Sequence, residues 1–577
     1  QLDRKDRVAI IDEANLMTTE TLNALISFLE IDMGQVIIFS EDKLEMNVRK
    51  KVVEALVDDD TVTLNIKPFL YDKRKILISN ILNQAGKVNE IEKETIKIND
   101  LINMQVKYFD LDPEFIISFV KQYEMDINFR YTAGMNVFNV VYESNIKNNI
   151  IVNSNEVDPT HVINILRELA YKMHFEKKCS VKMYEISEVI ETYKKDYRQK
   201  VNVKAFLDAV INAKIILEND NEFRFKDHTI IAYFVAQALN QKNNQGEDIQ
   251  ENIEMLLRNL CFNINSDIVL FLALITNNPK FVDIIINGAK EHFDNKEELS
   301  FDLENVKYIL DTKLPIKNSV PDKQEREQRE HEIAKQEESV KLTDLIEIVN
   351  EYDYTDKDLQ KIENQVMISF KYIEILSKTL PAFCQNMKVT QQDKLVDLIY
   401  HCPNKFLYAI LYDIGQDFDD FSNSLYNEIS TLRKEKNDGE ISLDSVRRVL
   451  EQVSSAIVIV LYQLVASTCT NEQSIMALNG FDCKQNTNYY LQNLMMSARV
   501  DNIVAFSKKA KKLDKMVDSN LAKSIIRYTV RDYFLRNNNI ELHGEAQSLM
   551  DHLFNDETSK SIKLNMAKKN LKEKDRT

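Results

Sequence analysis

Val8-Ala9-Ile10-Ile11-Asp12-Glu13 is a short apolar run that ends abruptly in two acids. Residues 35–39 form a second apolar run, and residues 61–66 form a third. Between the first two, the apolar residues of segment 21–29 follow the i, i+3, i+4, i+7 spacing of one helix face. Strand, helix and strand in this order predict a βαβ unit with parallel strands. Because the runs are almost continuously apolar, we expect strands buried on both faces.

The acids after the first run point to nucleotide chemistry. Asp12 and Glu13 follow the predicted carboxyl end of a parallel strand, which is the edge where such sheets bind ligands. In P-loop NTPases an aspartate here holds Mg²⁺, and the next glutamate polarises the attacking water. Ser40 follows the second run, where these enzymes carry a small polar residue that senses the γ-phosphate. The simpler alternative is that both strands end in solvated polar residues.

The composition favours a mostly helical chain. It has 577 residues with a hydrophobic content of 44%, but only nine glycines and eight prolines, which sheet turns would need in larger numbers. The net charge of −17 argues against broad nucleic-acid binding. The longest uninterrupted apolar run, residues 268–275, is too short to span a membrane. Six cysteines without a CxxC spacing indicate buried thiols in a reducing cytosol rather than zinc ligands or disulfides.

The pattern along the chain predicts four domains. Residues 1–70 form the α/β portion, and residues 71–155 form a helical domain. In residues 156–240, helices lead into two short strands around a polar turn, which outlines a winged-helix domain. Residues 245–577 contain successive helical pairs. Within them, residues 321–340 carry seven acids and four bases, which predicts an exposed helix or a disordered arm that is solvated rather than functional.

A phosphate-binding loop is missing from the sequence. The P-loop motif GxxxxGK[ST] occurs nowhere, and Gly86-Lys87 lacks both its upstream glycine and its hydroxyl residue. We therefore expect either that a P-loop half lies upstream or that the acidic strand is unrelated to nucleotide binding. His401-Cys402 is the one adjacent His/Cys pair, and we interpret it as a buried pair at a helix end rather than as a thiol site.

Residues 1–240 resemble the distal half of a NACHT-type STAND NTPase core followed by its winged helix. The resemblance is carried by the run ending in Asp12-Glu13, the run ending at Ser40, the segment 64–69 and the segment 223–236. The last segment combines an aromatic-x-Phe pattern, a histidine soon after, and an aromatic-rich helix that ends in alanine. In that family the histidine contacts the β-phosphate of bound ADP, so the resemblance implies this role for His228.

Two positions depart from the family pattern. The acidic strand of the family often reads DGxDE, whereas Asn15 stands here at the place of the second acid. Asp12 therefore matches the Mg²⁺ residue, but only Glu13 is available to activate water, which argues against rapid hydrolysis. The family's usual arginine after the second strand is absent, since Ser40 is followed by Glu41-Asp42-Lys43.

The resemblance implies the regulatory and sensor portion of a cytoplasmic STAND ATPase from the prokaryotic antiviral branch, acting in innate immunity against phage. Its cofactors would be ATP or ADP with Mg²⁺. A protein trigger, such as a phage protein, would bind the C-terminal helices and convert an ADP-bound resting state into an ATP-bound homo-oligomer. No membrane or nucleic-acid partner is expected.

Two other functions stay open. One is a transcription regulator of STAND architecture with a DNA-binding winged helix, although acids border the hairpin turn at residues 218–222. The other is a non-enzymatic helical scaffold in which Asp12-Glu13 has no catalytic role.

Overall fold

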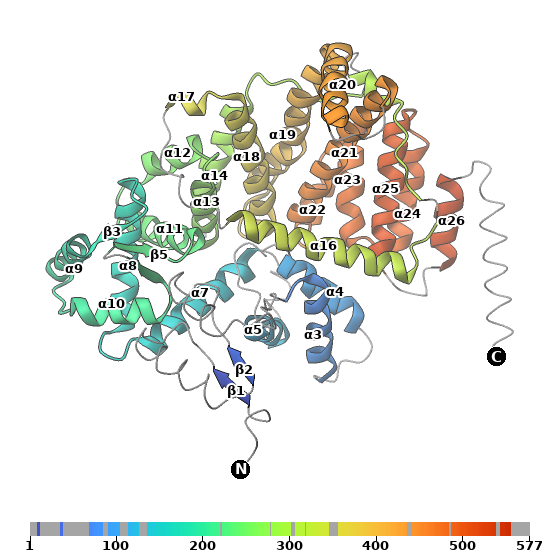
Figure 1. Cartoon of the computed structure of the whole chain (residues 1–577). Helices are drawn as coiled ribbons and strands as arrows, with labels where there is room; N and C mark the ends of the chain where they lie inside the picture. The colour runs from blue at the N-terminus through green and yellow to red at the C-terminus, as the bar shows by residue number, and fades with distance from the viewer. Residues whose placement is uncertain are drawn as a thin grey trace. The chain divides into compact units, whose positions relative to one another are not determined.

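The computed structural model describes residues 8–11, 35–38, 69–84, 91–103, 113–125, 135–219, 222–276, 279–301, 306–317, 319–344, 356–435, 441–483, 486–537 and 543–554. The chain forms two compact units, residues 1–68 and residues 69–577. The described part is mostly helical and contains a small antiparallel sheet, which confirms the predicted helical class (Figure 1). The predicted domain boundaries within residues 69–577 stay predictions.

In the first unit, β1 (Val8–Ile11) pairs with β2 (Gln35–Ile38) in parallel, as the two apolar runs predict. Ile10 lies opposite Ile37 in this pairing, and the two are 67% and 46% exposed. Val8 shares a face with Ile10, because strand side chains alternate, and it is also exposed. The expectation of burial on both faces is therefore wrong for this face. The predicted helix 21–29 and strand 61–66 lie outside the described residues.

The second unit opens with α3 (Tyr71–Gln84), α4 (Ile91–Asn103), α5 (Pro113–Met125) and α7 (Met135–Asn153). α3 packs against α4 and α5. Ile78 and Leu82 of α3, and Ile98 and Ile102 of α4, are at most 2% exposed. Because residues four apart share a helix face, each helix turns one apolar face towards its neighbours.

Residues 159–244 combine helices with the small sheet. The elements follow in the order α8 (Pro159–Phe175), β3 (Val181–Lys182), α9 (Met183–Tyr197), α10 (Val203–Asn212), β4 (Ile216–Asn219), β5 (Glu222–Phe225) and α11 (His228–Asn244). β4 and β5 form the predicted hairpin, and β3 adds to β5 in the antiparallel order β3-β5-β4. The side chains of Asp158, Asn202 and Asp227 cap α8, α10 and α11.

The remaining chain forms helices, many of which pack more extensively on the next helix but one, or on more distant helices, than on their sequence neighbours. They are α12 (Gln250–Arg258), α13 (Asn263–Thr276), α14 (Pro279–Phe293), α15 (Lys307–Leu310), α16 (Lys323–Asp344), α17 (Asp356–Leu359), α18 (Ile362–Phe383), α19 (Val389–Gln416), α20 (Phe418–Glu435), α21 (Leu443–Cys469), α22 (Ser474–Asn479), α23 (Thr487–Val500), α24 (Ile503–Asp514), α25 (Asn520–Arg536) and α26 (His543–Leu553). The described residues from 250 onward contain no strand, which confirms their predicted helical structure.

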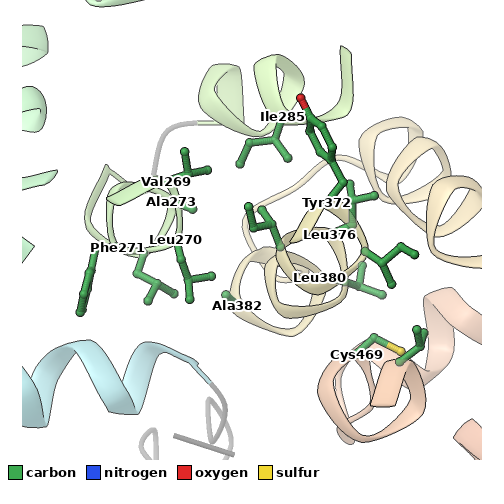
Figure 2. Packing of buried hydrophobic residues seen from close by; sticks show 14 of the residues in the cluster. Val269, Leu270, Phe271, Ala273, Ile285, Tyr372, Leu376, Leu380, Ala382 and Cys469 are labelled. Atoms are coloured by element: carbon green, nitrogen blue, oxygen red, sulfur yellow. The ribbon is translucent and has the colours of Figure 1, made fainter. Parts of the chain in front are cut away.

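The core of this region lies between α13, α14, α18 and α21 (Figure 2). Ile285 of α14 and Leu376 and Leu380 of α18 are fully buried. Cys469 is also fully buried, and burial raises the pKa of its thiol to about 12, so it behaves as a small hydrophobe. All six cysteines are free and four are buried, but Cys179 is exposed in the loop before β3, where the prediction of a buried thiol is wrong.

Within the described residues, α21 is the helix that is long and apolar enough to cross a membrane. Val458, Tyr462 and Val465 are at most 1% exposed, and α21 packs against α18 and α23. Half of its apolar window is buried in this way, so a core position accounts for its composition and no clear membrane-spanning pattern results. The length of uninterrupted apolar runs does not identify α21 as a long apolar helix, because serines and a glutamine interrupt its sequence.

Candidate functional site

Three of the predicted site residues, Asp12, Glu13 and Ser40, lie outside the described residues. The strands that precede them are described, and Ile11 pairs with Ile38 at the last position of each strand. Both strands therefore end at the same edge of the parallel pair. The roles of the three residues in metal binding, catalysis and nucleotide binding stay predictions.

His228, the fourth predicted residue, is partly exposed and is the first residue of α11. The helix cap is its neighbour Asp227, whose carboxylate accepts a 2.8 Å hydrogen bond from the N–H of Ile230. The N-cap of α11 is therefore Asp227 and not His228. The Asp227 carboxylate thus occupies one of the first-turn N–H groups beside the imidazole.

The helix that begins with His228 is rigidly embedded. The rings of Phe225 and Phe234 lie 6.1 Å apart, and Tyr233 meets Phe271 of α13 edge to face at 5.7 Å. Arg167 of α8 donates to the amide oxygen of Gln237 at 3.1 Å. These contacts fix the start of α11 relative to β5, α8 and α13, so the position of the imidazole is set by packing on three elements.

A second arrangement, which the sequence did not predict, is built on α16. Residues 321–340 were expected to form an exposed helix or a disordered arm, and the helix is the correct alternative. Its two aliphatic residues before Val340, Ile333 and Ala334, pack against Leu70 and Tyr71 at the start of α3. One face of this highly charged helix is therefore docked rather than solvated.

At this docked face the charges are paired. The Arg74 guanidinium lies 2.7 Å from the Glu337 carboxylate, and the two side chains are 0% and 3% exposed. The second oxygen of Glu337 accepts a 2.7 Å hydrogen bond from the backbone N–H of Tyr71, while Arg74 also donates to Asn99 of α4 at 2.6 Å. The pair thus has the additional hydrogen bonds that a buried ion pair requires.

The N-terminal half of α16 is held by α25. Glu325 accepts from Arg531 at 2.7 Å, and Arg329 lies 2.9 Å from the Asp532 carboxylate. Burial opposes ionisation of Glu325, but the hydrogen bonds from Lys317 and Arg531 outweigh it and lower its pKa. The charges of these groups are therefore maintained at neutral pH.

α16 is the long helix beside α3 and α25 in Figure 1, and it connects these two helices through ion pairs. The sequence does contain a signal for the docked face, because Glu330, Ile333, Ala334 and Glu337 follow the i, i+3, i+4, i+7 spacing. No local signal identifies the partners Arg74 and Asp532.

His401 and Cys402 lie in the middle of α19, not at a helix end as predicted. The imidazole forms ion pairs with Glu298 and, at 3.3 Å, with Asp397. Burial opposes its charged form, but these two carboxylates outweigh burial and raise the pKa of His401 to about 9. Burial also raises the pKa of the Cys402 thiol, so the cysteine is an inert core residue and the site is an ion-pair cluster.

A comparison with models of known protein families matches part of the chain. Residues 180–235 match the family model described as Novel STAND NTPase 4, from just before β3 into α11. The matched segment contains β3, α9, α10, the hairpin and His228, and it supports a STAND NTPase family. No curated protein matches the chain. The family implies nucleotide binding, and within the described residues no group of three His, Cys, Asp or Glu side chains could hold a metal ion.

Proposed function

We propose that this chain is the regulatory and sensor portion of a cytoplasmic NACHT-type STAND ATPase in anti-phage defence. The observation that carries the proposal is the family match over residues 180–235, which ends in the helix that begins with His228. The order helix, strand, helix, helix, strand, strand in residues 159–225 also supports a winged-helix domain. In this proposal the nucleotide-binding half with the P-loop lies upstream.

The proposed resting state contains ADP, and activation replaces it with ATP and leads to a homo-oligomer. Asp12 would hold Mg²⁺, Glu13 would orient water, and Ser40 and His228 would contact phosphate oxygens. The bound metal would neutralise phosphate charge. The chain's own contribution is to position an imidazole on a helix fixed by α8, β5 and α13.

The connection through α16 supports a sensor role for the C-terminal helices. A trigger protein on this region would displace α25, and the ion pairs at Glu325 and Arg329 would transmit the displacement along α16 to Arg74 of α3. Such a device needs two arrangements of the same element, each favoured by a different ligand.

The charge of the hairpin disfavours the alternative function as a DNA-binding regulator. Glu218 of β4 and Glu222 of β5 are both exposed, and Glu222 accepts a hydrogen bond from Ser180 at 2.6 Å. Exposed carboxylates at this tip would repel a phosphate backbone.

The proposal is tested with Asp12→Ala in the protein that carries its P-loop half. We expect the variant to fold but to lose ATP-driven assembly, measured by light scattering. Asp58→Ala, which removes an acid of the same unit without an assigned role, is the control and should assemble normally. ATP-driven assembly of Asp12→Ala at the wild-type level would contradict the assignment.

A further inference from the structure

The outer face of α24 and the C-cap residue after it carry a row of lysines that have no partner among the described residues. Lys508, Lys512 and Lys515 are exposed, and no described residue forms an ion pair or hydrogen bond with their ammonium groups. Spacings of four and three residues place them about 6 Å and about 4.5 Å apart along the helix axis. They therefore form one line of positive charge on a single helix face.

The neighbouring lysines, by contrast, already form ion pairs and hydrogen bonds within the chain. Lys509 lies 2.9 Å from the carboxylate of Asp501 and also donates to Ser497 at 2.6 Å. Lys511 lies 3.2 Å from Glu545 of α26 and donates to Ser548 at 3.0 Å. Asp501 and Glu545 thus pair with these two lysines, and no described acid pairs with the outer row.

The row borders a groove of about 580 Å³ between α24 and α26. Four lysines and one glutamate line it, in a chain whose net charge is −17, so the groove is a local region of positive potential. Val504 and Met516 line the same groove and are 65% and 49% exposed. An occupant would therefore meet both ammonium groups and apolar surface.

We propose that this groove is a docking site for an acidic, amphipathic helical segment of a partner protein. Carboxylates at positions i, i+4 and i+7 of such a helix match the spacing of Lys508, Lys512 and Lys515, and its apolar residues cover Val504 and Met516. Methionine adapts its shape readily to a partner's side chains.

The lining chemistry favours a peptide over a nucleic acid. Proteins that bind single strands use aromatic side chains on which bases stack, and arginines that stack or bind phosphates in a bidentate manner. The lining residues of this groove include neither an aromatic residue nor an arginine. The negative charge of the whole chain also repels a long polyanion more strongly than a short acidic helix.

This inference rests on the proposed function in one respect, namely that the partner protein is the trigger. The groove lies in the C-terminal helical region, and α24 packs against α25, the helix that holds α16. A helix that binds along α24 is therefore one helix away from the ion pairs that lead to α3.

The test uses the full chain and a labelled amphipathic peptide of about 20 residues, long enough to form a helix, with glutamates at i, i+4 and i+7. The control peptide has the same sequence but carries glutamine at those three positions. We expect the acidic peptide to bind at least about tenfold more tightly in fluorescence anisotropy, and high salt to remove the difference. The combined variant Lys508→Glu, Lys512→Glu, Lys515→Glu should lose this preference.

The control variant Lys290→Glu, Lys388→Glu, Lys394→Glu changes the net charge equally, at exposed lysines on α14, at the N-cap of α19 and on α19, and should bind like the wild type. Equal binding of both peptides, or equal loss in both variants, would overturn the proposal. Preferential binding of an oligothymidylate that depends on the α24 lysines would also overturn it in favour of nucleic acid. Nucleotide binding is measured separately, and its absence would count against the proposed function without affecting this inference.

Discussion

The guanidinium of Arg74 lies 2.7 Å from the carboxylate of Glu337, although 263 residues separate the two in the sequence. Both side chains are almost completely buried where α16 meets α3. A buried charge is stable only with its partner, because removing one partner leaves the other desolvated and unpaired. This relationship makes the docking of α16 dependent on two specific residues.

We expect Arg74→Met and Glu337→Gln each to destabilise the docking of α16 by about 3–5 kcal/mol, since each leaves one buried group uncompensated. The combined variant should be less destabilised than the sum of the two. Urea unfolding, together with hydrogen exchange of α16, measures both effects through a double-mutant cycle.

Lys75→Met is the matched control for this cycle. It removes the ion pair between Lys75 and Glu330 on the same two helices, where the side chains are 28% and 22% exposed. A partly exposed pair should contribute at most about 1 kcal/mol. If Lys75→Met were as destabilising as Arg74→Met, burial would not be the reason for the strength of the Arg74 pair.

The ion pairs of His401 predict that the stability of the folded chain decreases at alkaline pH. The pKa of His401 is raised to about 9 in the folded chain, above an unfolded value of about 6.5. Its stabilisation is therefore complete below pH of about 6.5 and is lost as pH rises through about 9. The free energy of unfolding should fall over this interval by an amount on the order of a few kcal/mol.

Urea unfolding at several pH values measures this loss, with His401→Asn as the control. The variant should be less stable at neutral pH and should lack the alkaline decline. An equally steep decline in His401→Asn would assign the pH dependence to another group.

The close packing around Gly288 on α14 predicts that a larger side chain at this position destabilises the chain. A Cβ at this position would lie 2.9 Å from the hydroxyl of Tyr372 and 3.2 Å from Leu257. Tyr372 is buried and its hydroxyl donates to the Leu257 carbonyl, so it cannot move away without loss. We expect Gly288→Ala to destabilise the chain by about 1–3 kcal/mol, despite the better helix propensity of alanine.

Thermal unfolding of Gly288→Ala measures this effect. The same substitution in a Tyr372→Phe background tests whether the tyrosine hydroxyl causes it. Because phenylalanine lacks the clashing oxygen, the alanine should cost less in that background than in the wild type. An alanine that is neutral or stabilising in the wild-type background would show that α14 and α18 adjust freely.

The sequence predicts those features that depend on neighbouring residues. The parallel runs at Val8–Ile11 and Gln35–Ile38, the hairpin at residues 216–225 and the helical C-terminal region all follow from local patterns. The exposure of Ile10 was not predicted, because an apolar run does not reveal whether a second layer covers it.

The candidate site was less predictable than the fold. The spacing from Glu330 to Glu337 identifies a helix face, but the choice of Arg74 as partner depends on how distant helices pack. The same holds for His401, whose partner Glu298 lies in a loop about a hundred residues away. A local sequence pattern can identify the helix face that carries such an ion pair, but it does not identify the distant partner.

The last prediction separates the roles of two adjacent residues, His228 and Asp227. If the imidazole donates to an ADP phosphate, it contributes one charge-assisted hydrogen bond worth about 1.5–3 kcal/mol. His228→Ala should then speed ADP release roughly ten- to a hundredfold and give partial activity without a trigger, with little change in melting temperature. Asp227→Ala should instead remove the helix cap, lower stability by about 1 kcal/mol and leave ADP release nearly unchanged. Measuring the ADP off-rate and the melting temperature of both variants distinguishes the two roles. An unchanged off-rate in His228→Ala would exclude a phosphate contact, because losing such a contact in the resting state must accelerate release.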